Sequence, residues 1–143
     1  MPSFTLGRSR KSTRPRNVIV VEDDAVLGLA IEQALSESGI ASVSICPSTA
    51  CTLDRLREGS YDAIVLDVHL ADSNEGWEIA ELVTALGEEE TRIVFQTDSP
   101  EAIPEHVRQL GPILTKPCDP DQLIAALSEQ PRPGLLKILR GKG

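Results

Sequence analysis

The sequence has no apolar run that approaches the roughly 20 residues needed to span a bilayer. Its N-terminus also has no apolar run of signal-peptide length. We therefore expect neither membrane insertion nor secretion, and we expect a cytoplasmic location. Cysteine is scarce, with 3 in 143 residues and no C-x-x-C motif. From this odd number we expect Cys46, Cys51 and Cys118 to be reduced thiols that fill small gaps.

The two histidines do not suggest a zinc site either. His69 and His106 have no ligand-like spacing to the cysteines. No internal repeat is present, and a chain of 143 residues with 41% hydrophobic and 25% charged composition fits a single core. We therefore predict one globular domain.

Acidic residues are missing from both ends of the chain, although the net charge is −8. Residues 1–16 carry +5, residues 131–143 carry +4, and residues 17–130 carry −17. Residues 17–130, the body of the chain, are strongly acidic and therefore repel nucleic acid. We expect no nucleic-acid partner. We interpret residues 1–16 as a disordered basic tail and residues 131–143 as a basic, apolar tail. The second tail is either solvated or a short helix that docks on the body, a partner or a membrane surface.

The body alternates short apolar runs with helix-like stretches. Continuous apolar runs bounded by turn residues are typical of buried parallel strands. The predicted strands are 18–21, 41–46, 63–66, 93–95 and 113–114, and helical spacing predicts helices within 26–38, 49–58, 77–86 and 120–127. Pro100 and Pro104 leave room for only two or three helical turns between residues 99 and 111. The predicted fold class is therefore α/β, a doubly wound five-stranded parallel sheet.

Charged residues follow three of these strands. Glu22, Asp23 and Asp24 follow the first strand, Asp67 follows the third, and Lys116 follows the last. Asp24 can cap the next helix, which leaves the other acids free for another role. Parallel strands end at one edge of a sheet, where such folds bind ligands. Carboxylates and an ammonium that meet there would hold a divalent cation and a phosphoryl group.

Asp67 strengthens this interpretation, because it ends a wholly apolar strand. A buried carboxylate is costly without a partner, and a cation shared with Asp23 would supply one. Lys116 provides a point charge that suits phosphate. Thr97 follows the fourth strand. Its hydroxyl either lies at the same edge of the sheet as these charged groups or caps a helix.

Four segments together resemble one known family: 19–24 (IVVEDD), 61–67 (YDAIVLD), 95–97 (FQT) and 114–117 (LTKP). Over residues 17–130 the chain resembles a response-regulator receiver domain, the phosphoacceptor half of two-component signalling. The resemblance implies a flavodoxin-like fold with strand order 2-1-3-4-5. That order places the strands that precede Asp23 and Asp67 side by side.

The resemblance also implies a metal site. Asp23 and Asp67 would ligate Mg²⁺, the backbone carbonyl of His69 would complete the protein ligands, and Glu22 would hold a coordinating water. Mg²⁺ prefers such a set, with few carboxylates and several waters.

The same resemblance implies how phosphoryl transfer occurs. Asp67 would be the nucleophile that takes a phosphoryl group from the phosphohistidine of a histidine kinase or phosphotransfer protein. Lys116 and Thr97 would bind the phosphoryl oxygens, as charge neutralisation in this reaction requires. Receiver domains have a cis peptide bond before the proline of their Lys-Pro pair. The resemblance therefore implies that Lys116–Pro117 is cis.

The chain departs from the family pattern around its fourth helix. Fewer residues separate Thr97 from Lys116 than in typical receivers, so this helix should be short or partly disordered. The segment 95–99 (FQTDS) is similar to the Phe-x-Thr-Gly-Tyr pattern of a single-domain subgroup, but Asp98 and Ser99 depart from its last two places.

These features predict a stand-alone, Mg²⁺-dependent phosphoacceptor that signals to a downstream protein target by altered contact, and not a turnover enzyme. One alternative is an interaction module that uses the same scaffold without phosphorylation. Another is a phosphatase with an aspartyl nucleophile, which would have a second Asp where this chain has His69.

Overall fold

The sheet has the predicted topology. The computed structural model describes residues 14–70, 72–73, 75–86 and 91–128. Five parallel strands follow the order β2-β1-β3-β4-β5, which confirms the predicted doubly wound fold. Their bounds are β1 Asn17–Val21, β2 Ser42–Cys46, β3 Ala63–Leu66, β4 Arg92–Thr97 and β5 Ile113–Thr115.

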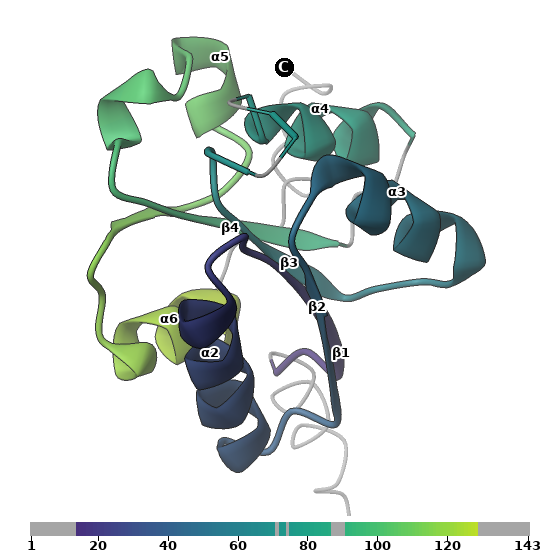
Figure 1. Cartoon of the computed structure of the whole chain (residues 1–143), viewed down its shortest axis with the longest axis vertical. Helices are drawn as coiled ribbons and strands as arrows, with labels where there is room; N and C mark the ends of the chain where they lie inside the picture. Colours follow the sequence, from purple (N-terminus) through teal and green to yellow (C-terminus); the bar gives the residue numbers. More distant parts are fainter. Residues whose placement is uncertain (1–13, 71, 74, 87–90, 129–143) are drawn as a thin grey trace, which may run out of the picture.

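Helices cover both faces of the sheet. In Figure 1, α2 and α6 lie together on one face, and α3, α4 and α5 lie on the other. The helices are α2 Ala25–Glu37, α3 Thr49–Glu58, α4 Trp77–Ala85, α5 Glu105–Arg108 and α6 Pro120–Ser128, with a 3₁₀ turn, η1, at Pro100–Ala102. Among the described residues, no helix is long and apolar enough to cross a bilayer.

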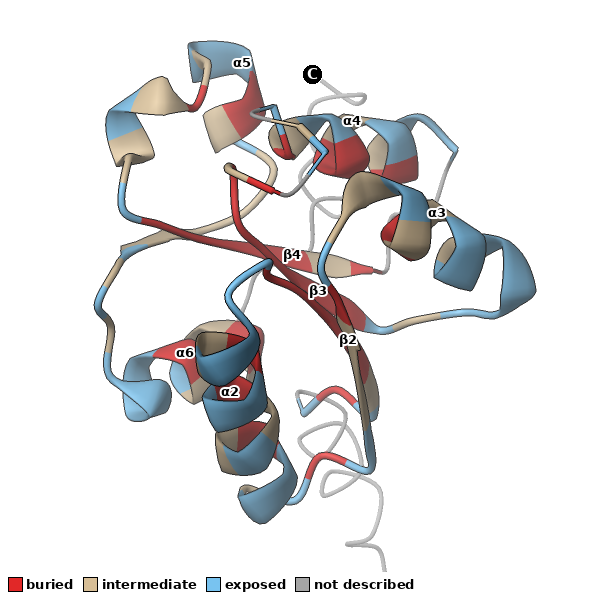
Figure 2. Ribbon diagram, viewed as in Figure 1, coloured by how far each residue is buried: buried red, intermediate tan, exposed pale blue. Residues whose placement is uncertain are grey.

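The sheet is buried from both sides, as Figure 2 shows for the central strands. Successive side chains of a strand point to opposite faces. Val18 and Val20 of β1 therefore pack with the buried residues of α2 and α6, while Ile19 and Val21 pack with those of α4 and α5. This two-sided burial explains why the strand sequences are continuously apolar.

Local signals in the sequence set the helix ends. The Asp24 carboxylate accepts from the backbone N–H groups of Val26 and Leu27, at 3.0 and 3.1 Å, so it caps α2 as predicted. Ser48 caps α3 by accepting from the N–H of Cys51. After α2, Gly39 has a φ of +103°, a conformation that glycine adopts without strain.

The fourth helix is short, as predicted. Pro100 begins η1 and Pro104 is the N-cap of α5, which has only four residues. Neither proline can donate a backbone hydrogen bond, so a longer helix cannot form across this segment. Val107 is the only buried residue of α5.

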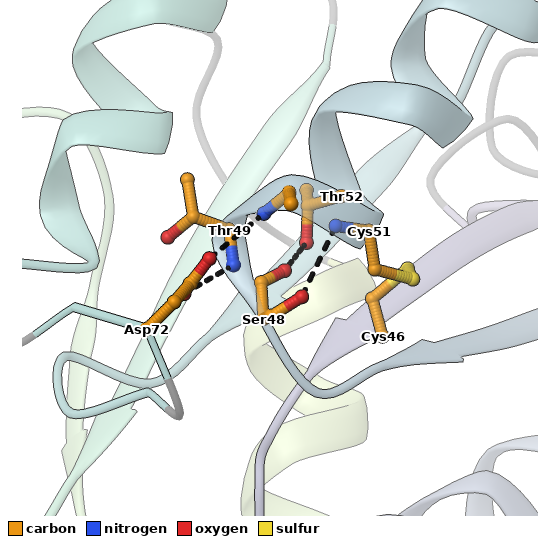
Figure 3. Close-up of a disulfide and its surroundings, with 7 residues drawn as sticks. Cys46, Ser48, Thr49, Cys51, Thr52 and Asp72 are labelled. Atoms are coloured by element: carbon orange, nitrogen blue, oxygen red, sulfur yellow. Dashed lines mark hydrogen bonds between the residues drawn. A yellow bond between two sulfur atoms is a disulfide. The ribbon is translucent and has the colours of Figure 1, made fainter.

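The prediction of three reduced thiols is wrong for two of them. Cys46 and Cys51 form a disulfide, drawn in Figure 3, and Cys118 is free. The chain reverses direction between the end of β2 and the start of α3. This brings the two Cα atoms to 5.5 Å, within the range of a disulfide.

Other details of the sequence interpretation also change. Arg14, assigned to the N-terminal tail, donates to the carbonyl of Ser38 at 2.8 Å, and Pro15 is buried. The spacing of Ala50, Leu53 and Leu56 predicts an apolar inner face for α3, but Ala50 is exposed and Thr52 is the residue buried there. Arg16 of the N-terminal tail donates its N–H to Asp62 at 2.9 Å, whereas residues 1–13 and the C-terminal tail lie outside the described residues.

We predict that Ile64→Ala lowers the free energy of unfolding by about 2–5 kcal/mol, because it leaves a cavity in the central strand β3. Ile64 is fully buried and packs in the core on the face of the sheet covered by α4 and α5. The matched control is Leu29→Ala on the outer face of α2, where the side chain is 58% exposed. It should change stability by no more than about 0.5 kcal/mol. Urea unfolding of both variants measures this, and equal losses would contradict the assignment of the core.

Candidate functional site

Two carboxylates are held at the carboxyl edge of the sheet by neighbouring strands. Glu22 follows β1 and Asp67 follows β3, whose last residues are paired in the sheet register. Backbone bonds extend the sheet past the strand ends: the Asp67 N–H donates to the Val21 carbonyl at 3.1 Å, and the Glu22 N–H donates to the Cys46 carbonyl at 2.9 Å. Both acids are buried, with 3% and 5% of their surface exposed.

Lys116 reaches both of these carboxylates. Its Nζ donates to Glu22 Oε1 at 2.7 Å and to Asp67 Oδ2 at 3.0 Å. The lysine follows β5, and its N–H donates to the Thr97 carbonyl at the end of β4. As expected, the Lys116–Pro117 peptide bond is cis. The sheet therefore brings together three residues that are far apart in the sequence.

Burial and hydrogen bonding shift the pKa values in this cluster. Burial raises the pKa of Glu22 above its ordinary value of 4.5, and the hydrogen bond from Lys116 offsets only part of this effect. For Lys116, burial acts to lower the pKa, but the hydrogen bonds to Glu22 and Asp67 outweigh it and the pKa is raised. The lysine is therefore a stable cation, while Glu22 is ionised at a cost.

Asp23 adds a third carboxylate to the pair. Its side chain is exposed, and one oxygen from each of Glu22, Asp23 and Asp67 lies within 4.8 Å of the other two. Two oxygens on opposite sides of a bound Mg²⁺ ion are about 4 Å apart, so small side-chain movements would let these oxygens share one ion. Three carboxylates against one lysine leave excess negative charge. The residues present therefore fit a divalent cation.

The loop after β3 shapes the other side of the cluster. The His69 N–H donates to Asp67 Oδ1 at 3.3 Å, so both oxygens of Asp67 have partners. Gly76 donates its N–H to the Val68 carbonyl at 2.8 Å. A Cβ at Gly76 would overlap the Asp67 carbonyl oxygen and lie 2.9 Å from that of Val68. Only glycine allows this close approach.

Thr97 ends β4 and is fully buried. Its hydroxyl oxygen accepts from the Ser99 N–H at 3.0 Å, at the start of η1. This bond closes a local turn before η1; the N-cap of η1 is Ser99, so Thr97 does not cap that helix. The hydroxyl still has a proton to donate to a ligand.

Residues 72–76 are rich in turn-forming types, so the sequence predicts no more than a loop at Asp72 and Gly76. Asp72 in fact accepts from the N–H groups of Thr49 and Ala50, at 2.8 and 3.2 Å, and so attaches the loop after β3 to the start of α3 (Figure 3). The bond from the Thr49 N–H is the main cause of the lowered pKa of Asp72. An acidic residue in a loop gives no sign of which distant helix it will reach.

The fold and this cluster together define a flavodoxin-like α/β domain with an acidic cluster and a lysine at the sheet edge. The family model for the response regulator receiver domain matches residues 18–128, and the chain belongs to this family. Receiver domains accept phosphoryl groups in two-component signalling and bind Mg²⁺ in such an acidic cluster. No curated protein sequence matches the chain.

Solved structures with this fold are similar but distant in sequence. A CheY-like receiver domain protein from Methanospirillum hungatei has a TM-score of 0.70 at 20% identity, over 90% of this chain and 98% of that one. The receiver domain of the PhyR response regulator from Erythrobacter litoralis has a TM-score of 0.67 at 21% identity, over 82% and 90%. The Thermotoga maritima response regulator TrrA, in complex with Mg²⁺–BeF, has a TM-score of 0.67 at 18% identity, over 76% and 92%.

We predict that Glu22→Gln stabilises the metal-free protein at pH 7. A raised pKa means that the stabilising contribution of Glu22 is complete below about pH 4.5 and is lost as the pH rises through the folded-state pKa. Glutamine stays neutral and can still accept from Lys116. The gain over wild type should therefore shrink as the pH falls toward 4.5. Urea unfolding between pH 4.5 and 7 tests this, with the exposed Glu58→Gln as control, and a loss of stability at pH 7 would refute it.

Gly76→Ala should destabilise the protein by about 1–3 kcal/mol, because the new methyl group overlaps two carbonyl oxygens. It should also weaken Mg²⁺ binding, because relief of the overlap displaces the loop that carries Asp67. The control is Gly59→Ala, where a Cβ would meet nothing within 4 Å. Denaturant unfolding and calorimetric Mg²⁺ titration measure the two effects. Equal behaviour of the two variants would show that the close approach has no role.

Proposed function

We propose that this protein accepts a phosphoryl group on Asp67 from the phosphohistidine of a histidine kinase or phosphotransfer protein, with Mg²⁺, and signals to a downstream protein through altered contacts. The observation that carries the proposal is the convergence of Lys116 Nζ on Glu22 and Asp67, beside the exposed carboxylate of Asp23. Membership of the receiver family and the structural similarity to the Mg²⁺–BeF complex of TrrA support it.

In the proposed reaction, a carboxylate oxygen of Asp67 attacks phosphorus. The phosphorus–nitrogen bond breaks, and its electron pair returns to the imidazole of the donor. Lys116, 3.0 Å from Asp67 Oδ2, is placed to neutralise charge on the phosphoryl oxygens. Bound Mg²⁺ would supply further neutralisation and would be held by Asp23, Asp67 and the His69 carbonyl, with Glu22 on a coordinating water. Each protein molecule is modified once, so we do not propose a turnover enzyme.

The proposed output begins at Thr97. Its hydroxyl oxygen now accepts from the Ser99 N–H, which holds the chain where η1 begins. Donation from Thr97 to a phosphoryl oxygen would reorient this hydroxyl and weaken that bond. The segment beyond it has little regular structure: η1 has three residues and α5 has four, and its buried side chains are Ile103 and Val107. We propose that this segment changes position and alters the surface seen by a partner.

The cytoplasmic location, the stand-alone organisation and the absence of a nucleic-acid partner stay predictions. The segment around Phe95 and Thr97, with its short α5, supports similarity to the Phe-x-Thr-Gly-Tyr subgroup.

A small phosphodonor such as acetyl phosphate tests the proposal directly. With Mg²⁺, the wild-type protein should gain one phosphoryl group that maps to Asp67 by mass spectrometry, and without Mg²⁺ it should gain little. Asp67→Asn should gain none, while Asp54→Asn, an exposed acid of α3, should behave as wild type. A folded protein that takes no phosphoryl group would favour the unphosphorylated interaction module. Steady turnover of a phosphate ester would favour the phosphatase.

A further inference from the structure

The disulfide lies one hydrogen bond from the acidic cluster. Cys46 is the last residue of β2, and its carbonyl accepts from the N–H of Glu22 at 2.9 Å. Cys51 lies in the first turn of α3 (Figure 3). Cys46 is fully buried, whereas Cys51 is partly exposed. Formation or reduction of this disulfide therefore alters the link between α3 and the proposed phosphoacceptor site.

The helix that carries Cys51 is held weakly by the core. Thr52 is its only buried residue, whereas α2 and α4 each bury three. Figure 2 shows the contrast between α3 and α4. The start of α3 is instead attached by two other links. One is the disulfide to β2, and the other is the pair of hydrogen bonds that Asp72 accepts from Thr49 and Ala50.

Asp72 connects this helix start to the site. It belongs to the same loop as Asp67 and His69, between β3 and α4. A fixed first turn of α3 presents its N–H groups to Asp72 and so restrains the loop. Without the disulfide, the first turn would keep buried Thr52 and the hydrogen bonds to Asp72 but would lose its covalent link to β2. The loop would then be less preorganised for a cation.

We propose that Cys46–Cys51 is a reversible thiol–disulfide site, and that its oxidation state sets how firmly α3 holds the loop with Asp67. As regulation of phosphoryl acceptance, this rests on the proposed function. Disulfides in reducing compartments are typically transient or redox-sensing, so the predicted cytoplasmic location would favour a reversible pair.

The partly exposed sulfur of Cys51 is the one that exchanges with an external partner, a low-molecular-weight disulfide such as oxidised glutathione. The Cys51 thiolate attacks one sulfur of this disulfide, and one thiolate leaves. The Cys46 thiolate then attacks Cys51 sulfur and releases the second thiolate. The protein loses two electrons and two protons, and the external disulfide becomes two thiols.

The first test follows the thiols. The full-length protein is equilibrated in buffers of defined reduced-to-oxidised glutathione ratio and then alkylated. Mass spectrometry counts the alkyl groups that are added to cysteine. Two alkylation sites, mapped to Cys46 and Cys51, should appear and disappear together and reversibly. Cys118→Ser should keep this transition and Cys51→Ser should lose it. A pair that stays oxidised, or that does not re-form, would overturn the proposal.

The second test measures the coupling to the site. Calorimetric titration with Mg²⁺ alone should show about fivefold weaker binding to the reduced protein, the low end of the usual range for coupling between two sites. Cys51→Ser should match the reduced protein in any glutathione buffer, and Cys118→Ser should follow wild type. Asp72→Ala should bind weakly in both oxidation states, because the connection is broken. Equal affinities of oxidised and reduced wild type would overturn the proposal.

Acetyl phosphate treatment of both oxidation states separates the two proposals. If neither state is modified on Asp67, the proposed function fails, and the Mg²⁺ affinities still decide whether the disulfide acts on the loop. If both states are modified at the same rate, the regulatory proposal fails and the proposed function stands. A slower reaction of the reduced protein supports both.

Discussion

An imbalance of charge at one edge of the sheet is the constraint on which this structure depends. Three carboxylates, those of Glu22, Asp23 and Asp67, share a small region with a single ammonium group, that of Lys116. Burial makes the excess negative charge expensive, as the raised pKa of Glu22 shows. The positive charge of a bound divalent cation offsets this cost. The cluster therefore favours a divalent cation.

The rest of the fold keeps these charges in place. Strands buried on both faces form a rigid platform, and parallel pairing carries their carboxyl ends to the same edge. The loop after β3 is held from two sides: Gly76 packs against the carbonyl groups of residues 67 and 68, and Asp72 is bonded to the start of α3. Preorganisation of this kind allows a few side chains to act on a small, highly charged ligand.

Much of the architecture was predictable because its signals are local. Continuous apolar runs indicated buried strands, the carboxylate of Asp24 indicated a helix start, and two prolines indicated a short fourth helix. Helical spacing was a less exact guide on α3, where Ala50 is exposed and Thr52 is buried. A short helix with few apolar residues does not define its inner face clearly. The placement of Glu22, Asp67 and Lys116 followed from strand order, since parallel strands must end together.

The sequence by itself determined which residue types stand at the strand ends, because apolar periodicity and turn chemistry act over a few neighbouring residues. Only the tertiary structure decided which of them touch: that Lys116 binds both Glu22 and Asp67, and that Asp72 reaches the first turn of α3. It also decided that Cys46 pairs with Cys51, since the turn between β2 and α3 sets their separation. Such contacts depend on how whole elements pack, and no short segment of sequence encodes them.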